Sequence, residues 1–216
     1  MKLSSTVLGF TLATALFSQI ASAGVLSIEK GSRTIEGVSI GSSATLNMGG
    51  SMKLDYIGSG LRSKKVLVSN VKVYVAQIFM DNAGKFVRSA SGAVQSVGDM
   101  KAGAVRLTFL RSVDAPTVQT SFKDAFNANG VDVNNSGVKA FLSAVSKGAD
   151  ASSGHSMTMA MKREGAGVTL VYENTKGGSS TIKGDSSLFK AVMSIWIGNP
   201  ADSGLATLKS SILSGK

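Results

Sequence analysis

The stretch GSGLRSKKVLVSNVKVYVAQIFM, residues 58–80, decides the fold because its second half has a clear period of two. Val71, Val73 and Val75 are predicted to share one face of a strand. The opposite face of this predicted strand carries Lys72, Tyr74, Ala76 and Ile78. β-branched residues favour strands, and no helical spacing fits these positions as well. The stretch therefore predicts a long β-strand that follows a basic segment.

Outward from this strand, the chain has predicted strands first and predicted helices later. Alternating segments bounded by Gly, Ser or Asn predict strands at 25–28, 34–40, 44–48, 51–60 and 104–112, and a hairpin at 156–174. Apolar residues at helical spacing predict helices from a cap at Asp114 to Gly130, from a cap at Ser136 to Gly148, over 186–198 and over 202–215. Residues 176–184 are interpreted as a connection into the last two helices. This order predicts an α+β domain whose helices pack on an antiparallel sheet.

The first 23 residues have the features of a cleaved signal peptide. Lys2 provides a positive charge, an apolar run follows at 7–20, and the small residues Ala21 and Ala23 suit a cleavage site after Ala23. The alternative is a membrane anchor, but the run is shorter than the roughly 20 residues that span a bilayer. We therefore predict a signal peptide at 1–23, one domain at 24–216, and a periplasmic or secreted protein.

Charge and composition narrow the classes of partner. The chain has a formal net charge of +10, which could suit nucleic acid, anionic lipid or an acidic cell-wall polymer. However, the basic residues are scattered, and no aromatic residues are interleaved with them as a nucleic-acid stacking platform requires. We predict no nucleic-acid partner, while contact with a membrane is compatible with the charge but not implied by it.

Catalytic and metal-binding motifs are sparse. The chain has no Cys, and its one His, His155, lies in a predicted loop. No tight acidic cluster, nucleophile elbow or phosphate-binding loop is present, so we predict no metal and no cofactor and assign no catalytic residue. Met157, Met159 and Met161 share a predicted strand face, which suits either ordinary core or an adaptable pocket wall. Trp196 is predicted to anchor the core.

From the residues alone, Arg62 is interpreted as a solvated charge at a strand end, next to Lys64 and Lys65. The same pattern makes Tyr74 an amphipathic strand residue whose hydroxyl lies near water. Periodicity does not distinguish a packed core from a cavity wall, so a strand-end arginine aimed into a cavity stays open as the alternative.

Several segments in the same order resemble the chalcone isomerase-like family. They are the strand with Leu54, Gly58, Gly60 and Arg62, the strand VYVAQIFM at 73–80, VRLTFLRSVDAPTV at 105–118, and the closing segment 167–215. The resemblance covers residues 34–215. It implies an open-faced β-sandwich, in which helices are layered on one face of an antiparallel sheet.

The resemblance implies two functional classes: enzymes that cyclise chalcones, and non-catalytic proteins that bind fatty acids through an Arg and a Tyr. Arg62 matches the family arginine. The strand threonine of the enzymes falls at Tyr74, their last-helix hydroxyl falls at or beside Ile195, and their first-helix Tyr and Asn fall near Val118 and Ala125. Most polar groups of the enzymes are therefore missing here.

The resemblance therefore favours a non-catalytic periplasmic binder of a small amphipathic anion such as a fatty acid, with Arg62 and Tyr74 as the ligand-binding residues. A guanidinium suits a carboxylate geometrically. One alternative is an isomerase or intramolecular lyase that acts on a chalcone-like phenolic enone. Another alternative is a structural protein without a ligand cavity.

Overall fold

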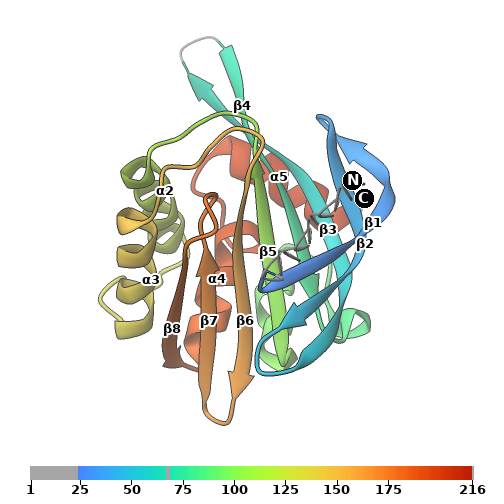
Figure 1. Cartoon of the computed structure of the whole chain (residues 1–216), viewed down its shortest axis with the longest axis vertical. Coiled ribbons are helices and arrows are strands. Elements are labelled where there is room, and N and C mark those ends of the chain that lie inside the picture. The colour runs from blue at the N-terminus through green and yellow to red at the C-terminus, as the bar shows by residue number, and fades with distance from the viewer. Residues whose placement is uncertain (1–23, 67–68, 216) are drawn as a thin grey trace, which may run out of the picture.

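A computed structural model describes residues 24–66 and 69–215 of the chain, so the predicted signal peptide lies outside the described residues (Figure 1). Its framework is an eight-stranded sheet in which the strands follow one another in chain order. Every neighbouring pair is antiparallel. The strands are β1 (Leu26–Ile35), β2 (Val38–Asn47), β3 (Ser51–Val66), β4 (Ser69–Met80), β5 (Ala102–Phe109), β6 (Ser156–Glu164), β7 (Gly167–Glu173) and β8 (Ser179–Asp185).

The helices pack on one face of this sheet and leave the sheet open (Figure 1). They are α1 (Ala93–Ser96), α2 (Ala115–Ala128), α3 (Ser136–Lys147), α4 (Ser187–Ile197) and α5 (Ser203–Ser214), with short 3₁₀ turns η1 (Ala83–Lys85) and η2 (Val97–Asp99). Figure 1 shows α4 and α5 behind the sheet, with β1 crossing in front of it. The predicted α+β class and the open-faced arrangement are confirmed.

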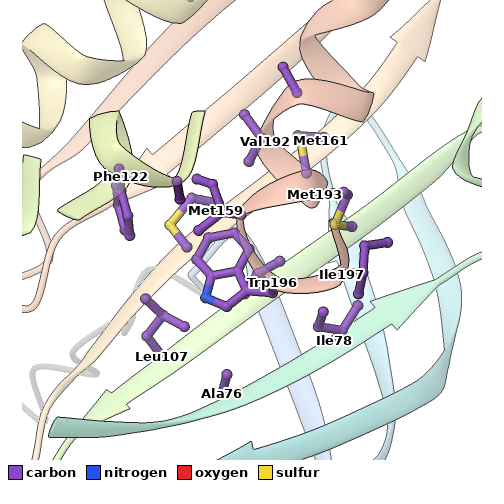
Figure 2. Packing of buried hydrophobic residues seen from close by; sticks show 14 of the residues in the cluster. Ala76, Ile78, Leu107, Phe122, Met159, Met161, Val192, Met193, Trp196 and Ile197 are labelled. Carbon is purple, nitrogen blue, oxygen red and sulfur yellow. The ribbon is translucent and has the colours of Figure 1, made fainter. Parts of the chain in front are cut away.

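Large aromatic and aliphatic side chains fill the space between the sheet and the helices. Figure 2 shows Trp196 of α4 among Phe122, Leu107 and Met159, which come from a helix and two strands. Met159 is fully buried, as is Met161, and Met157 is almost so. The methionine stripe therefore belongs to the ordinary sheet core, and Trp196 anchors that core as predicted.

The opposite face of the sheet has a smaller core. Leu54 and Phe79 pack there beside Ala104 and Ala160, and β1 and β2 fold back over them. Because alanines present little bulk, the covering strands come close to the sheet. A Cβ added at Gly41 of β2 would lie 3.1 Å from the Phe79 ring. This face is thus covered by one hairpin, not by helices.

The predicted bounds or type of three segments were wrong. The predicted strand at 34–40 is broken by a turn at Glu36 and Gly37, both with positive φ, so β1 and β2 form a hairpin. Asn135, not Ser136, caps α3 by accepting from the backbone N–H of Gly137. Residues 176–184, interpreted as a connection, contain most of β8, which has one buried apolar side chain and pairs with β7.

Candidate functional site

A cavity of about 520 Å³ opens between α2 and the adjoining ends of β3, β4 and β5. The first residues of α5, with its cap, close one side of it, and Ile195 of α4 contributes to its wall. Its apolar lining consists of Val66, Val71, Val73, Phe109, Val113, Val118, Phe122, Ala128, Ile195, Ala201 and Leu205. The polar and charged lining consists of Arg62, Lys64, Tyr74, Arg111, Ser112, Asp114, Thr117, Ser121, Asp124, Asn127 and Asp202.

A β-bulge in β4 determines which side chains face this cavity. Arg62 lies opposite Tyr74, but Ser63 lies opposite Lys72, so Val73 is an extra residue on β4. An extra residue interrupts the alternation of a strand. Val73 therefore lines the same cavity as Tyr74. The prediction that Val71, Val73 and Val75 share one face was wrong, because the bulge separates the first two from Val75.

Arg62 lines the cavity and is buried, with 7% of its surface exposed. Its guanidinium forms an ion pair with Asp202 at 2.6 Å and also donates to the carbonyl oxygen of Ser63. The interpretation of Arg62 as a solvated strand-end charge is therefore wrong. Its neighbours Lys64 and Lys65 are exposed, as the residues alone predicted.

Asp202 connects the arginine to the start of α5. One carboxylate oxygen accepts from the backbone N–H of Leu205 at 2.9 Å, which caps the helix, and the other accepts from Arg62. Burial opposes ionisation of this carboxyl, but the Leu205 N–H and the Arg62 charge outweigh it and lower the pKa of Asp202. Its side chain is 40% exposed, so solvent still reaches the ion pair.

Tyr74 lies beside Arg62 on the neighbouring strand and is buried. Its ring packs edge-on against Phe109, and its hydroxyl oxygen accepts from the indole nitrogen of Trp196 at 3.2 Å. Burial raises the pKa of the Tyr74 hydroxyl, and the nearby Arg62 charge opposes this without outweighing it. Tyr74 therefore stays neutral at ordinary pH and keeps a proton that it can donate.

The mouth of the cavity carries polar groups that the sequence reasoning missed. Arg111 follows β5 and is exposed, while Thr117, Ser121 and Asn127 project from α2. Asp202, the partner of Arg62, was also missed. The segment DSGL did predict a helix start, but nothing in it indicates a partner 140 residues earlier in the chain.

Comparison with known proteins identifies the family of this chain. The chalcone isomerase-like family matches residues 32–214. The chain belongs to the chalcone isomerase-like family. Among curated proteins, none matches the sequence. A fatty-acid-binding protein of Arabidopsis thaliana has a similar solved structure, with a TM-score of 0.56 and 17% identity over 83% of this chain and 93% of that chain. At this identity, the likeness shows the shared fold.

The residues at or near the positions where the resemblance implies polar groups in the enzymes, Ile195, Val118 and Ala125, are apolar here. Ile195 and Val118 both line the cavity. Ala125 is fully buried and lies outside the cavity lining. Two other residues of α2, Ser121 and Asn127, line the cavity with polar groups, at positions that the family resemblance did not indicate.

Other candidate chemistry is scarce in the part of the chain that the structure describes. His155 is exposed, and its ring is hydrogen-bonded to the carbonyl oxygen of Ser153 at 3.0 Å. Within residues 24–66 and 69–215, no group of three or more His, Asp or Glu side chains could hold a metal ion. No helix in these ranges has the length and apolar character to cross a bilayer.

Proposed function

We propose that this protein is a non-catalytic binder of a small amphipathic anion such as a fatty acid, whose carboxylate Arg62 and Tyr74 hold. The observation that carries the proposal is that a buried guanidinium and a buried phenol hydroxyl lie opposite each other on neighbouring strands and line one largely apolar cavity. The family membership and the fatty-acid-binding protein of the same fold support it.

The head group would find its donors on neighbouring strands. The Tyr74 oxygen accepts from Trp196, and its own proton can be donated to a bound carboxylate. Arg62 offers five N–H groups: its guanidinium donates to Ser63 and Asp202 and also interacts with the Tyr74 hydroxyl, and the remaining N–H groups are available to a ligand. A carboxylate could therefore bind beside Asp202, or displace it from the guanidinium.

The tail would occupy the apolar part of the cavity. A volume of about 520 Å³ lies within the range of about 300–1,000 Å³ typical of small-molecule sites. Valines of β4 form one wall and Phe122 of α2 forms another. Burying an alkyl chain there would stabilise the complex by about 0.8 kcal/mol for each methylene removed from water.

The apolar residues at the enzyme positions favour binding over catalysis. An isomerase must place a water molecule and polarise an enone, and Ile195 and Val118 have no polar side-chain atom for this. A turnover assay with a chalcone tests the point directly. We expect no rate above the uncatalysed background, and measurable cyclisation would refute the non-catalytic function.

Retention of a ligand tests the binding function. Native mass spectrometry of the purified protein should show a bound fatty acid, which Arg62→Ala loses because the charge that holds the carboxylate is gone. Lys64→Ala is the matched control, since Lys64 lines the same cavity but is exposed. Circular dichroism would establish that both variants are folded. Equal retention by Arg62→Ala and the wild type would remove the role assigned to Arg62.

The proposed location is the bacterial periplasm or the exterior, and it rests on the pattern of the first 23 residues. Expression of the full chain in a Gram-negative host should yield a periplasmic protein whose intact mass corresponds to a chain that starts at Gly24. A cytoplasmic product that retains Met1 or Lys2 would contradict this location.

A further inference from the structure

The face of the sheet that lies opposite the helices carries a row of polar side chains. Across five adjacent strands, β3 to β7, the register aligns Ser59, Gln77, Arg106, Thr158 and Glu173. The apolar cluster of this face lies beside the row and includes Phe79 and Ala104, each two residues from a member of it. Arg106 lies at the middle of this row, where burial of its charge would be unfavourable without a partner.

Arg106 is half-buried, yet its guanidinium has no hydrogen bond and no ion pair within 4 Å in the described part of the chain. Glu173 is the acid whose charge reaches it without forming an ion pair, and one oxygen of that carboxylate accepts from the backbone N–H of Val25 at 2.9 Å. Burial lowers the pKa of Arg106, and Glu173 only partly opposes this. Burying a charge is costly unless it finds a partner.

Arg106 lines a wide cavity of about 700 Å³ that is open to solvent. It lies between the β1–β2 hairpin and the ends of β4, β5 and β6, and Gln77 and Thr108 line it with Arg106. Lys30 brings a second cation. The acid at the rim, Glu36, is already paired with Lys72 at 2.7 Å.

Other polar groups in this cavity are held in position. Gln77 accepts from the backbone N–H of Gly41 at 2.7 Å, and the hydroxyls of Thr108 and Ser156 are bonded to each other at 2.9 Å. The hydroxyl oxygen of Ser39 is buried without a hydrogen-bond partner among the described residues. The cavity thus combines two cations that form no ion pair within 4 Å in the described residues with fixed polar groups and one unpartnered hydroxyl.

We propose that this second cavity binds the oxyanion group, phosphate or carboxylate, of a small hydrophilic molecule, with Arg106 as its principal ligand and Lys30 as a supporting charge. A guanidinium presents paired N–H groups that match two oxygens of either anion. The site is separate from the cavity at Arg62, because Gln77 and Tyr74 lie on opposite faces of β4.

Titration with sodium phosphate, followed by amide NMR at constant ionic strength, tests the proposal. Saturable shifts should centre on Gln77, Arg106 and Ser156, and Arg106→Gln should weaken binding roughly tenfold by removing the charge-assisted bonds. Arg33→Gln is the matched control, because Arg33 is exposed on β1 and lies outside the cavity lining. Its affinity should equal that of the wild type.

A parallel titration with sodium citrate distinguishes the two sources of the oxyanion. Tighter citrate binding would assign the site to carboxylates, and tighter phosphate binding would assign it to phosphorylated molecules. Shifts that do not saturate, that centre on Arg62, or that persist unchanged in Arg106→Gln would overturn the proposal. Arg106→Gln removes an unpaired side chain, so loss of the fold is not expected to obscure the result, and a thermal melt of each variant checks this.

Discussion

The two faces of the sheet each carry an arginine, buried in the case of Arg62 and half-buried in the case of Arg106, and the surroundings of the two charges differ. Under the helices, Arg62 is paired with Asp202 and lies beside Tyr74 and a cavity with largely apolar walls. On the opposite face, Arg106 forms no hydrogen bond or ion pair among the described residues, and it lines a solvent-open cavity whose walls are partly polar and partly apolar. A paired arginine can be part of the folded core, whereas an unpaired one contributes little to stability and is free to bind.

The two faces also differ in the size of their buried apolar side chains. The helix face packs Trp196 and several phenylalanines, while the opposite face is built largely from alanines under a single hairpin. Because the free energy of burial scales with apolar area, most of the stability must come from the helix face. The predictions below test this contrast.

The largest effect is expected for Phe141→Ala. Phe141 is fully buried and its ring contacts those of Phe122, Phe126 and Tyr172. Truncation should lower the free energy of unfolding by about 3–5 kcal/mol, measured by urea denaturation. Ile28→Ala, at the partly buried edge of the opposite cluster, should cost about 1 kcal/mol. Equal costs for the two variants would contradict the contrast.

A smaller effect is expected at high pH for Tyr172. Its buried hydroxyl has no hydrogen-bond partner in the described residues, and burial raises the pKa of Tyr172 to about 12. In the unfolded chain, a tyrosine ionises near pH 10. Between about pH 10 and 12, Tyr172 ionises in the unfolded chain but not in the folded protein. This stabilises the unfolded chain and lowers the free energy of unfolding by about 2 kcal/mol in total.

Tyr172→Phe should abolish that part of the alkaline decline and leave stability at neutral pH unchanged or slightly higher. Urea unfolding of the variant and the wild type at a series of alkaline pH values provides the measurement. The comparison is needed because lysines also titrate in this range. Parallel alkaline declines in the two proteins would show that the hydroxyl finds a partner.

At the cavity, Asp202→Asn should strengthen binding of a fatty acid about tenfold, because it removes the anion that competes for Arg62. The amide oxygen can still cap α5, so we expect a loss of only about 1 kcal/mol in stability. Fluorescence competition with a fatty-acid probe measures the affinity. Asp114→Asn is the control, since Asp114 caps α2 and lines the cavity but does not contact an arginine. Weaker binding by Asp202→Asn would contradict the predicted competition.

The same variant has a defined pH dependence. Because the pKa of Asp202 is lowered in the folded protein, its contribution to stability is complete above pH of about 4. This contribution is lost as pH falls through the folded value. Asp202→Asn should therefore lose less stability than the wild type in acid, as measured by thermal melts at a series of acidic pH values. A steeper acid decline in the variant would count against the ion pair.

The smallest effect is expected for Arg106→Gln without added anion. Since no hydrogen bond or ion pair is lost among the described residues, the free energy of unfolding should change by less than about 0.5 kcal/mol. Arg62→Gln should cost clearly more under the same conditions, because it leaves Asp202 without its charged partner. A large loss for Arg106→Gln would mean that Arg106 has a structural partner.

Local periodicity predicted most of the elements, since it depends only on neighbouring residues. It did not predict the bulge at Val73, because VKVYV alternates without interruption. It missed β8, where Ile182 is the one buried apolar residue. From the residues alone, Arg62 resembled its neighbours Lys64 and Lys65. The family resemblance distinguished Arg62 from these lysines, because the family pattern has an arginine at this position of the fold.

The partners at the candidate site could not be predicted, because they come together only through packing. Asp202 reaches Arg62 across 140 residues of sequence. Similarly, the alternation at 104–112 predicted that Arg106 and its sequence neighbours lie on opposite faces of a strand. It did not predict that the β1–β2 hairpin covers the face of Arg106. Contacts at such separation depend on how whole elements pack, which local patterns do not contain.

The chain-order sheet and the late position of α5 have a consequence for the order of folding. Each strand pairs only with its sequence neighbours, so hairpins can form soon after their residues are available. Asp202 and α5 come last in the chain, and they must pack against β3, which comes early in the chain order. The sheet should therefore assemble before the cavity closes, and a chain that ends before α5 would be trapped as an open intermediate that exposes its apolar helix face.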